Sequence, residues 1–224
     1  MYAVSILLLA LMTSVQCQQT AEDWFNKGDL LLNQSKHNES IDAFDKAIEL
    51  DPKLAEAWNK KGMALRAHIR YDDAIKAYDK AIEINPKYAE AWLNRGSILN
   101  AMGKNDDAIK AFDKAIEINP KNPQTWFLKG CGLDAWGKDD EAIKAYDKAI
   151  EINPQDYSAW KFKGNALADL GKYDEAIKAY DKAIEINPKY AYVWKSKGDA
   201  LKLLGLTSEA DAAFAKAEEL GYIG

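Results

Sequence analysis

Histidine and cysteine are nearly absent from the chain, which has two of each among 224 residues. No cysteine or carboxylate stands at a ligand-like interval from His37 or His68, so the sequence predicts no metal site and no cofactor. Both histidines are expected to be structural or to face solvent. Cys17 falls in an apolar amino-terminal segment, which leaves Cys131 without a partner for a disulfide. The fold is therefore expected to depend on the packing of apolar side chains.

Catalytic motifs and an excess of positive charge are missing as well. The chain has no Gly-rich phosphate loop, no G-x-S-x-G and no H-E-x-x-H, so it is predicted not to be an enzyme. Its 30 basic and 35 acidic residues are spread evenly, which leaves no basic patch for a nucleic acid. Because 48% of the residues are hydrophobic and only 6 are proline, the chain is expected to fold rather than to be disordered.

The amino-terminal segment carries no charged side chain before Glu22. Its apolar run, Ala3 to Met12, is too short for a bilayer core, which needs about 20 residues, so no integral membrane span is predicted. Small and polar residues follow the run, which indicates a signal peptide over residues 1–17, cleaved after Cys17, and a short lead-in at 18–20. The protein is therefore predicted to be secreted or held at the cell surface. Since no Lys or Arg precedes the run, the alternative is a cytoplasmic protein whose amino terminus is not a signal.

Two glycosylation sequons lie close together in the chain. They are Asn33-Gln34-Ser35 and Asn38-Glu39-Ser40. If the chain is exported, glycans on Asn33 and Asn38 are expected.

One fourteen-residue segment recurs four times with almost no change, and each copy begins 34 residues after the last. On this period the chain divides into six repeats, at 21–54, 55–88, 89–122, 123–156, 157–190 and 191–224. Three residue types recur four and three positions apart, which places them on one face of a first helix. They are Trp at 24, 58, 92, 126, 160 and 194, Gly at 28, 62, 96, 130, 164 and 198, and Leu at 31, 65, 99, 133, 167 and 201.

The second half of each repeat has the same helical spacing, as in Ala74, Ile75 and Tyr78. A proline ends this helix in the first five repeats, because proline has no amide to donate. Glycine at 103, 137, 171 and 205 is expected to close the first helix, and acidic pairs open the second, where carboxylates suit the helix dipole. Each repeat is therefore predicted to be a helix hairpin, and the fold class to be all-α.

The pattern W-x2-[KR]-G-x2-L, then A-x3-[YF]-x2-A and Pro, resembles the tetratricopeptide repeat (TPR) across residues 21–224. This resemblance implies a right-handed α-α superhelix, or solenoid, in which each of six helix-turn-helix repeats covers the apolar face of the next. Where the family usually has Leu before the Gly, this chain has a basic residue. The aliphatic stem of that residue is expected to pack while the charge reaches water. The residues are Lys27, Lys61, Arg95, Lys129, Lys163 and Lys197.

The sixth repeat differs from the others in a way that suggests a cap. Asp211 and Glu218 replace isoleucines that occupy the same two places in earlier repeats, seven residues apart on one helical face. Both places become acidic where no seventh repeat would cover them. The array is therefore predicted to be self-capped and complete at its carboxyl end.

The six repeats differ most on a second face of the first helix. In the family this face lines a concave groove that holds an extended peptide or a partner helix, which the resemblance implies here too. The chain is therefore predicted to be a non-enzymatic scaffold that binds a peptide or protein segment. The predicted groove residues are Phe25, Asn59, Met63, Leu93, Phe127, Cys131, Lys161, Asn165, Tyr192, Lys195 and Lys202.

The charges on this face differ along the array, acidic in repeats one to three and basic in repeats five and six. A bound peptide is predicted to place an apolar anchor near Phe127 and an acidic end near Lys161 and Lys195. The alternative is that these are solvated helix residues of mixed composition. Lys161 and Asn165 match part of a carboxylate clamp found in some family members, but Ser196 stands where that clamp needs Asn. A second function remains open, a structural cell-envelope spacer that forms homo-oligomers.

Overall fold

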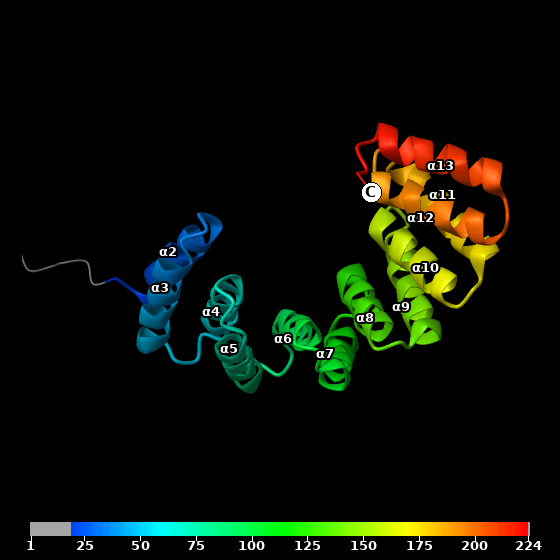
Figure 1. Cartoon of the computed structure of the whole chain (residues 1–224). Coiled ribbons are helices and arrows are strands. Elements are labelled where there is room, and N and C mark those ends of the chain that lie inside the picture. The colour runs from blue at the N-terminus through cyan, green and yellow to red at the C-terminus, as the bar shows by residue number, and fades with distance from the viewer. Residues whose placement is uncertain (1–18, 224) are drawn as a thin grey trace, which may run out of the picture. The chain divides into compact units, whose positions relative to one another are not determined.

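The computed structural model describes residues 19–223. Within this part of the chain all twelve elements are α-helices and no strand occurs (Figure 1), so the predicted all-α fold is confirmed. The first helices of the repeats are α2 (Ala21–Asn33), α4 (Ala55–Ala67), α6 (Ala89–Ala101), α8 (Pro123–Ala135), α10 (Tyr157–Asp169) and α12 (Ala191–Leu203). The second helices are α3 (His37–Leu50), α5 (Tyr71–Ile84), α7 (Asn105–Ile118), α9 (Asp139–Ile152), α11 (Tyr173–Ile186) and α13 (Thr207–Glu219).

The predicted signal peptide at 1–17, its cleavage point after Cys17 and the first lead-in residue lie outside the described residues. The described chain starts just before α2, whose first turn is held by a capping box. Thr20 accepts a hydrogen bond from the Asp23 amide, and the Asp23 carboxylate accepts one from the Thr20 amide at 2.8 Å. Between residues 19 and 223, no helix has the length and apolar character needed to span a bilayer.

The helices form two blocks, which are described separately. The amino-terminal block extends to Lys87 and holds α2 to α5, and the carboxy-terminal block begins at Tyr88 and holds α6 to α13. In both blocks each first helix packs against the second helix of its own repeat, and that second helix packs against the first helix that follows within the block. This is the hairpin stacking that the repeat pattern predicts.

A glycine and an aromatic ring set the spacing of the two helices in each hairpin. A Cβ atom on Gly130 would lie 2.5 Å from Cε1 of Tyr146, and one on Gly164 would lie 2.5 Å from Cε1 of Tyr180. Gly28 stands in the same relation to Phe44 in the amino-terminal block. Only glycine lets the first helix approach a buried ring this closely, which explains why Gly recurs at this position.

Tryptophan connects successive repeats through a hydrogen bond. The Nε1–H group of Trp126 donates to the carbonyl oxygen of Pro120 at 2.9 Å, and Trp160 donates in the same way to Pro154 at 3.1 Å. The proline that ends one repeat therefore supplies an acceptor to the first helix of the next. Equivalent bonds join Trp58 to Pro52 and Trp194 to Pro188.

In four repeats the lysine before the glycine makes a second link to the preceding repeat. The Lys163 ammonium lies 2.6 Å from a carboxylate oxygen of Asp147 in the preceding second helix, and 5.5 Å from the centre of the Trp160 ring. The same ion pair joins Lys61 to Asp45, Lys129 to Asp113 and Lys197 to Asp181. For these four lysines the charge does not simply reach water, because each pairs with an aspartate of the preceding second helix.

The turn between the two helices of each hairpin contains a residue with a positive φ, the left-handed backbone conformation. Gly103, Gly137, Gly171 and Gly205 have φ values of 72°, 73°, 71° and 78°, as glycine at a helix carboxyl end should. The amino-terminal block uses Ser35 and Ile69 instead, with φ values of 58° and 61°. A β-branched residue is strained in this conformation, so Ile69 occupies an unfavourable position.

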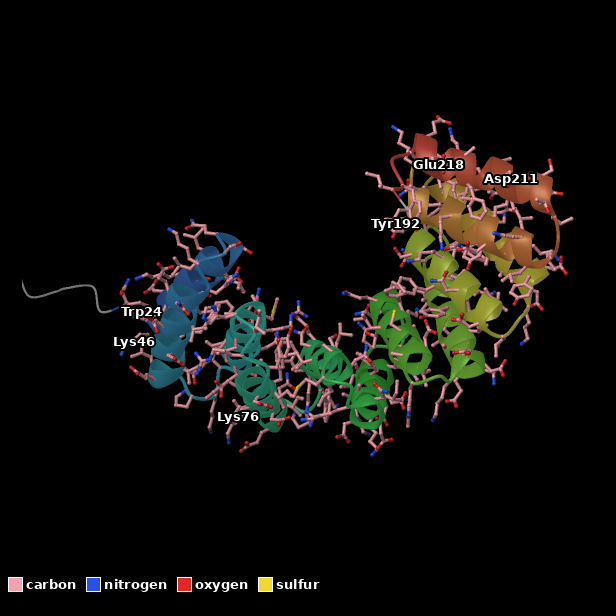
Figure 2. All side chains as sticks on the ribbon, in the orientation of Figure 1. Trp24, Lys46, Lys76, Tyr192, Asp211 and Glu218 are labelled. Atoms are coloured by element: carbon pink, nitrogen blue, oxygen red, sulfur yellow. The ribbon has the colours of Figure 1, made fainter. Side chains whose placement is uncertain are left out.

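Asp211 and Glu218 lie exposed on α13 (Figure 2). At the corresponding places of α9 and α11, Ile150 is buried and Ile177 is half-buried within the core of the block. These two places are thus acidic and solvated on the last described helix, and apolar and covered on earlier ones. That arrangement is what the predicted cap requires.

Candidate functional site

The first helices of the carboxy-terminal block form one layer, in which α6, α8, α10 and α12 pack in sequence. We call the surface of these four helices the inner layer. It carries seven of the predicted groove residues at half-buried or exposed positions, Phe127, Cys131, Lys161, Asn165, Tyr192, Lys195 and Lys202. Because neighbouring helices contact each other, side chains from different repeats meet on this surface.

Three aromatic rings form a cluster between α8 and α10. The ring centres of Phe127 and Phe162 are 5.4 Å apart in an edge-to-face arrangement, and Tyr146 of α9 lies 6.0 Å and 6.2 Å from them. Tyr146 is fully buried, whereas Phe127 and Phe162 are half-buried. The two phenylalanines thus offer apolar surface that rests on a fixed ring, a suitable seat for an apolar side chain. We call these three residues the aromatic seat.

Lys161 covers one edge of the aromatic seat. Its ammonium lies 4.1 Å from the centre of the Phe162 ring and 5.8 Å from that of Tyr190. Burial lowers the pKa of this amine. Among residues 19–223, no carboxylate forms an ion pair with Lys161. The sequence-predicted cation is therefore present, partly desolvated and without a carboxylate partner.

Lys195, the second predicted cation, is already engaged. Its ammonium lies 2.6 Å from the Asp199 carboxylate on the same helix, and this hydrogen bond raises the pKa of the lysine. The net charge at this end of the groove is unchanged, but Lys195 is no longer a free cation for a ligand. Lys202 is exposed.

A pocket of about 570 Å³ lies between α10 and α12, and two residues of α11 also line it. The Tyr180 hydroxyl donates a hydrogen bond to Oδ1 of Asn165 at 3.0 Å, which fixes this predicted groove residue in the wall. Two carboxylates, Asp169 and Asp199, also line the wall. The rest of the lining is Ala168, Tyr173, Tyr180, Ser196, Ala200 and Leu203. We call this cavity the α10–α12 pocket.

A row of tyrosines follows one edge of the inner layer. Tyr157 and Tyr190 have ring centres 5.3 Å apart, Tyr190 and Tyr192 are 6.0 Å apart, and Tyr192 and Tyr222 are 5.3 Å apart. Tyr192 is 59% exposed and is visible beside α12 (Figure 2). Tyr222 replaces the proline of earlier repeats, and its ring supports that of Tyr192.

Cys131 lies in the inner layer but is not a reactive thiol. Burial raises its pKa to about 11, and the hydrogen bond with the Tyr146 hydroxyl offsets only part of that effect. The thiolate is the nucleophilic form, so little of it is present at neutral pH. Cys131 therefore contributes packing to this surface rather than chemistry. Among the described residues, no group of His, Cys, Asp and Glu side chains could hold a metal ion.

The structure places two of the predicted groove residues in the interior. Asn59 is 0% exposed and Leu93 is 7% exposed, so neither offers surface to a ligand. The prediction is wrong for these two, because the helical face that varies between repeats is broader than the face that stays open. In the amino-terminal block Met63 is half-buried, and Phe25 lies 5.8 Å from the Phe44 ring beside a pocket of about 380 Å³.

Two sequence models of the tetratricopeptide repeat match this chain. One matches residues 25–89 and 59–123, and the other matches 123–156 and 157–190. The chain belongs to the tetratricopeptide repeat family. None of the curated proteins compared with the chain matches it.

Several solved structures resemble the chain. A crystal structure of MamA has 30% sequence identity and a TM-score of 0.68, and the match covers 71% of this chain and 93% of MamA. YrrB, described as a TPR protein with an unusual peptide-binding site, has 24% identity and a TM-score of 0.68, covering 80% and 92%. PilF of Pseudomonas aeruginosa has 17% identity and a TM-score of 0.77, covering 90% and 91%. At these identities YrrB and PilF show the fold alone.

Sequence reasoning missed three residues in or beside the inner layer of this TPR chain. Phe162, Asp169 and Tyr190 lie outside the four helix positions chosen as the groove. A signal was nevertheless present for Asp169, which occupies a place where three earlier repeats have alanine, at 67, 101 and 135. Phe162 likewise occupies a place that differs in most repeats.

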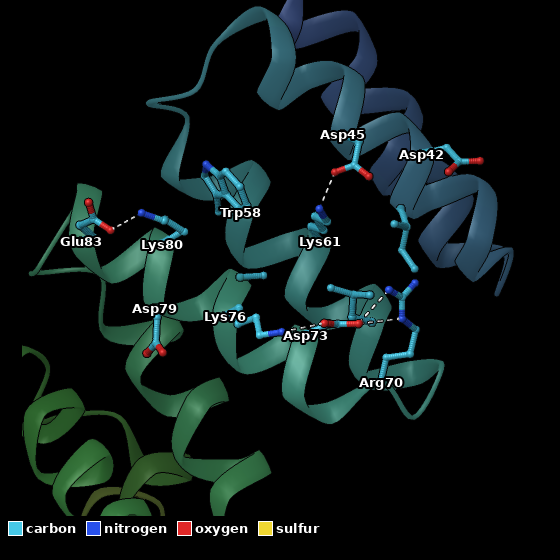
Figure 3. Close-up of a pocket in the computed structure, with 13 residues that line it drawn as sticks. Asp42, Asp45, Trp58, Lys61, Arg70, Asp73, Lys76, Asp79, Lys80 and Glu83 are labelled. Carbon is cyan, nitrogen blue, oxygen red and sulfur yellow. Dashed lines mark hydrogen bonds and ion pairs between the residues drawn. The ribbon is translucent and has the colours of Figure 1, made fainter.

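The TPR chain has a further pocket, of about 670 Å³, among α3, α4 and α5 of the amino-terminal block (Figure 3). Its floor is apolar, with Ile41, Trp58 and Leu65. Its rim holds charges that are mostly satisfied within the block: the Arg70 guanidinium lies 2.8 Å from Asp73, and Lys61 pairs with Asp45. These pairs belong to the links between and within repeats, which favours a structural explanation of this rim.

Proposed function

We propose that this chain is a non-enzymatic TPR scaffold whose inner layer binds an extended peptide or protein segment. The observation that carries the proposal is the combination of the aromatic seat with an unpaired cation, Lys161, on its edge. The half-buried rings offer an apolar anchor point, and the cation offers a partner for a carboxylate, including the acidic end predicted from the sequence. YrrB, which is described as having a peptide-binding site, shares this fold, which supports a role in protein interaction.

The contacts differ from the sequence prediction in the position of the carboxylate site. Lys195 already pairs with Asp199, so a carboxylate of the ligand would gain less there than beside Lys161. Lys161 is already partly removed from water and pairs with no carboxylate of the chain. A carboxylate of the ligand should therefore bind more strongly beside Lys161 than beside Lys195. The expected anchor is therefore Lys161 together with Phe127 and Phe162.

A photo-crosslinking comparison tests the proposal. The photoreactive amino acid p-benzoylphenylalanine is placed at Tyr192 in the inner layer or, as a matched control, at Lys178 on the exposed side of α11. Irradiation in an extract of the source cells should crosslink a defined partner from position 192 and not from position 178. Lys161→Glu should reduce that crosslink. Equal crosslinking from both positions would contradict binding on the inner layer.

Self-association is the second proposed function, and exposed apolar residues in the last repeat favour it. Leu203 is 64% exposed and Leu206 is 42% exposed, on either side of the turn between α12 and α13. A homo-oligomeric spacer would cover these side chains with another copy. Sedimentation equilibrium separates the two proposals, because a binding module should stay monomeric over a wide concentration range. A mass that rises with concentration, and falls in Leu203→Ser, would favour the spacer.

We further propose that the chain is exported and glycosylated. The apolar amino-terminal run supports export, and both sequon asparagines, Asn33 and Asn38, lie at exposed positions. The Ser40 hydroxyl of the second sequon donates a hydrogen bond to the Gly28 carbonyl, so this serine also has a role in the fold. Amino-terminal sequencing and intact-mass measurement of protein from the source cells test both points. A start at Met1 and a bare polypeptide mass would contradict them.

A further inference from the structure

Helix α10 carries two opposite charges that form no ion pair within the described chain. Lys161, in its second turn, lies over Phe162 without a carboxylate partner in the described chain. Asp169 is the last residue of the helix, and no lysine or arginine of residues 19–223 pairs with it. The last turn of α10 contains no basic residue. Because a helix carboxyl end has a partial negative charge, Asp169 stands at an electrostatically unfavourable end.

The same conflict occurs next to it on α8. Asp134 lies in the last turn of that helix, which also lacks a basic residue. Burial raises the pKa of Asp134, and the nearby charges of Asp139 and Asp169 raise it further. Carboxylates thus gather at the carboxyl ends of two adjacent inner-layer helices, a feature that reduces stability unless something else requires it.

The α10–α12 pocket offers a place for a cationic side chain of a ligand. Asp169 and Asp199 line it together with the aromatic side chains of Tyr173 and Tyr180, and the lining contains no lysine or arginine. Lys195 is not part of the lining but already pairs with Asp199. Asp169 is then the carboxylate of the lining that has no ion-pair partner. Carboxylates beside aromatic rings suit the charged head and apolar stem of a basic side chain.

The pocket and the unpaired lysine share one helix face. Lys161 is four residues before Asn165 and seven before Ala168, and the latter two line the pocket. On an α-helix these spacings lie on one side. Asp169 is eight residues after Lys161, a rise of about 12 Å along the helix. An extended peptide covers that length in three to four residues.

We infer that the segment bound by the inner layer places a Lys or Arg side chain in the α10–α12 pocket and a carboxylate beside Lys161. This inference rests on the proposed function. It adds to it the ligand's chemistry and spacing: an extended segment whose acidic and basic groups are three or four positions apart. The inner layer of α10 thus selects for a pair of opposite charges rather than for an acidic end alone.

Selection from a random dodecapeptide library displayed on phage tests this inference. The full chain and its Asp169→Lys variant are immobilised side by side, with bovine serum albumin as the background surface. Peptides selected by the wild type should be enriched at least tenfold in a Lys or Arg that stands three or four positions from an Asp or Glu. The variant should replace that basic residue by an acidic one.

One selected peptide, fluorescein-labelled, then gives affinities by fluorescence polarisation. Asp169→Asn and Lys161→Gln should each weaken binding at least tenfold, whereas the control Asp174→Asn, an equal charge change at an exposed site on α11, should change it less than twofold. Asp169→Asn should not lower the melting temperature, because it removes an acid from a helix carboxyl end.

The outcomes separate the inference from the proposal beneath it. If peptides bind and Phe127→Ala weakens them, but no paired charges are selected and Asp169→Asn has no effect, the inference is wrong and peptide binding stands. If the wild type selects no peptide above background, the proposed peptide-binding function is overturned and the inference with it.

Discussion

The second helices and the first helices of the carboxy-terminal block make different kinds of contact. Contacts that involve the second helices recur from repeat to repeat. They are an aromatic ring packed against a glycine, a hydrogen bond from tryptophan to a proline carbonyl, and an ion pair between lysine and aspartate. Contacts on the inner layer occur once each, as between Lys161 and Phe162 or Tyr192 and Tyr222. Recurring contacts assemble the array, and single contacts are free to form a binding surface.

The largest effect is expected from breaking a recurring contact, with Gly130→Ala. A Cβ atom would meet the buried Tyr146 ring at 2.5 Å, and overpacking of this kind costs about 3 kcal/mol. Alanine recovers about 1 kcal/mol through its higher helix propensity, so the net loss should be about 2 kcal/mol. Urea denaturation followed by circular dichroism measures it.

Gly132→Ala is the matched control, two residues along the same helix. There the nearest atom to a new Cβ is the mobile Cδ1 of Ile109 at 3.3 Å, so the variant should be neutral or more stable by up to about 1 kcal/mol. Equal destabilisation by the two substitutions would show that glycine recurs for a reason other than the ring.

A chemical probe of the inner layer comes next, through the alkylation of Cys131. The rise in its pKa from 9.0 to about 11 leaves roughly 100-fold less thiolate at pH 8. A thiolate of higher pKa is also more nucleophilic, which offsets part of this loss. Iodoacetamide should therefore modify Cys131 at least about tenfold more slowly than it modifies the exposed thiol of a Cys131→Ser, Ser208→Cys variant. Mass spectrometry over time gives both rates, and similar rates would mean that the inner layer around Cys131 is open to water.

The hairpin turns of the two blocks differ in the residue that has a positive φ, and Ile69→Gly tests what this difference costs. Ile69 adopts a φ of 61° and is 75% exposed, so it has strain without compensating burial. Removing the strain of a non-glycine residue in the left-handed conformation should stabilise the fold by about 1–2 kcal/mol. The greater conformational freedom of glycine in the unfolded chain should lower the stability by about 0.5–1 kcal/mol. The net gain should be about 1 kcal/mol in urea denaturation. Ile69→Ala keeps the Cβ atom and should gain little, and an equal gain would contradict strain as the cause.

The sequence predicted the hairpins well because the signals that fix them are local and repeated. Trp, Gly and Leu at helical spacing, glycine at turns such as Gly137 and proline at helix ends each act within a few residues. The ion pair between Lys163 and Asp147 was missed, although its signal was visible: aspartate recurs at that place in five repeats, and the last has Ala215. A pairing across two helices becomes evident only once the helices are placed.

The binding surface could be predicted only in part, for a physical reason. Helical periodicity gives the direction of a side chain, but it does not tell whether a neighbouring helix covers it, as happens to Asn59 and Leu93. It also does not tell which charges pair, as Lys195 does with Asp199 and Lys161 does not. The superhelical course of the full array and its export stay predictions.

The smallest effect is expected at the ion pair that links repeats four and five. Lys163→Met keeps an apolar stem against Trp160 and removes the charge 2.6 Å from Asp147, whose side chain is 50% exposed. An ion pair this close to water contributes about 0.5 kcal/mol. A double-mutant cycle with Asp147→Asn should return a coupling energy of that size that shrinks in 1 M salt, because salt screens exposed charges. A coupling energy near zero would mean that the recurring lysine stabilises the array only through the packing of its aliphatic part. The recurrence of aspartate would then need another cause.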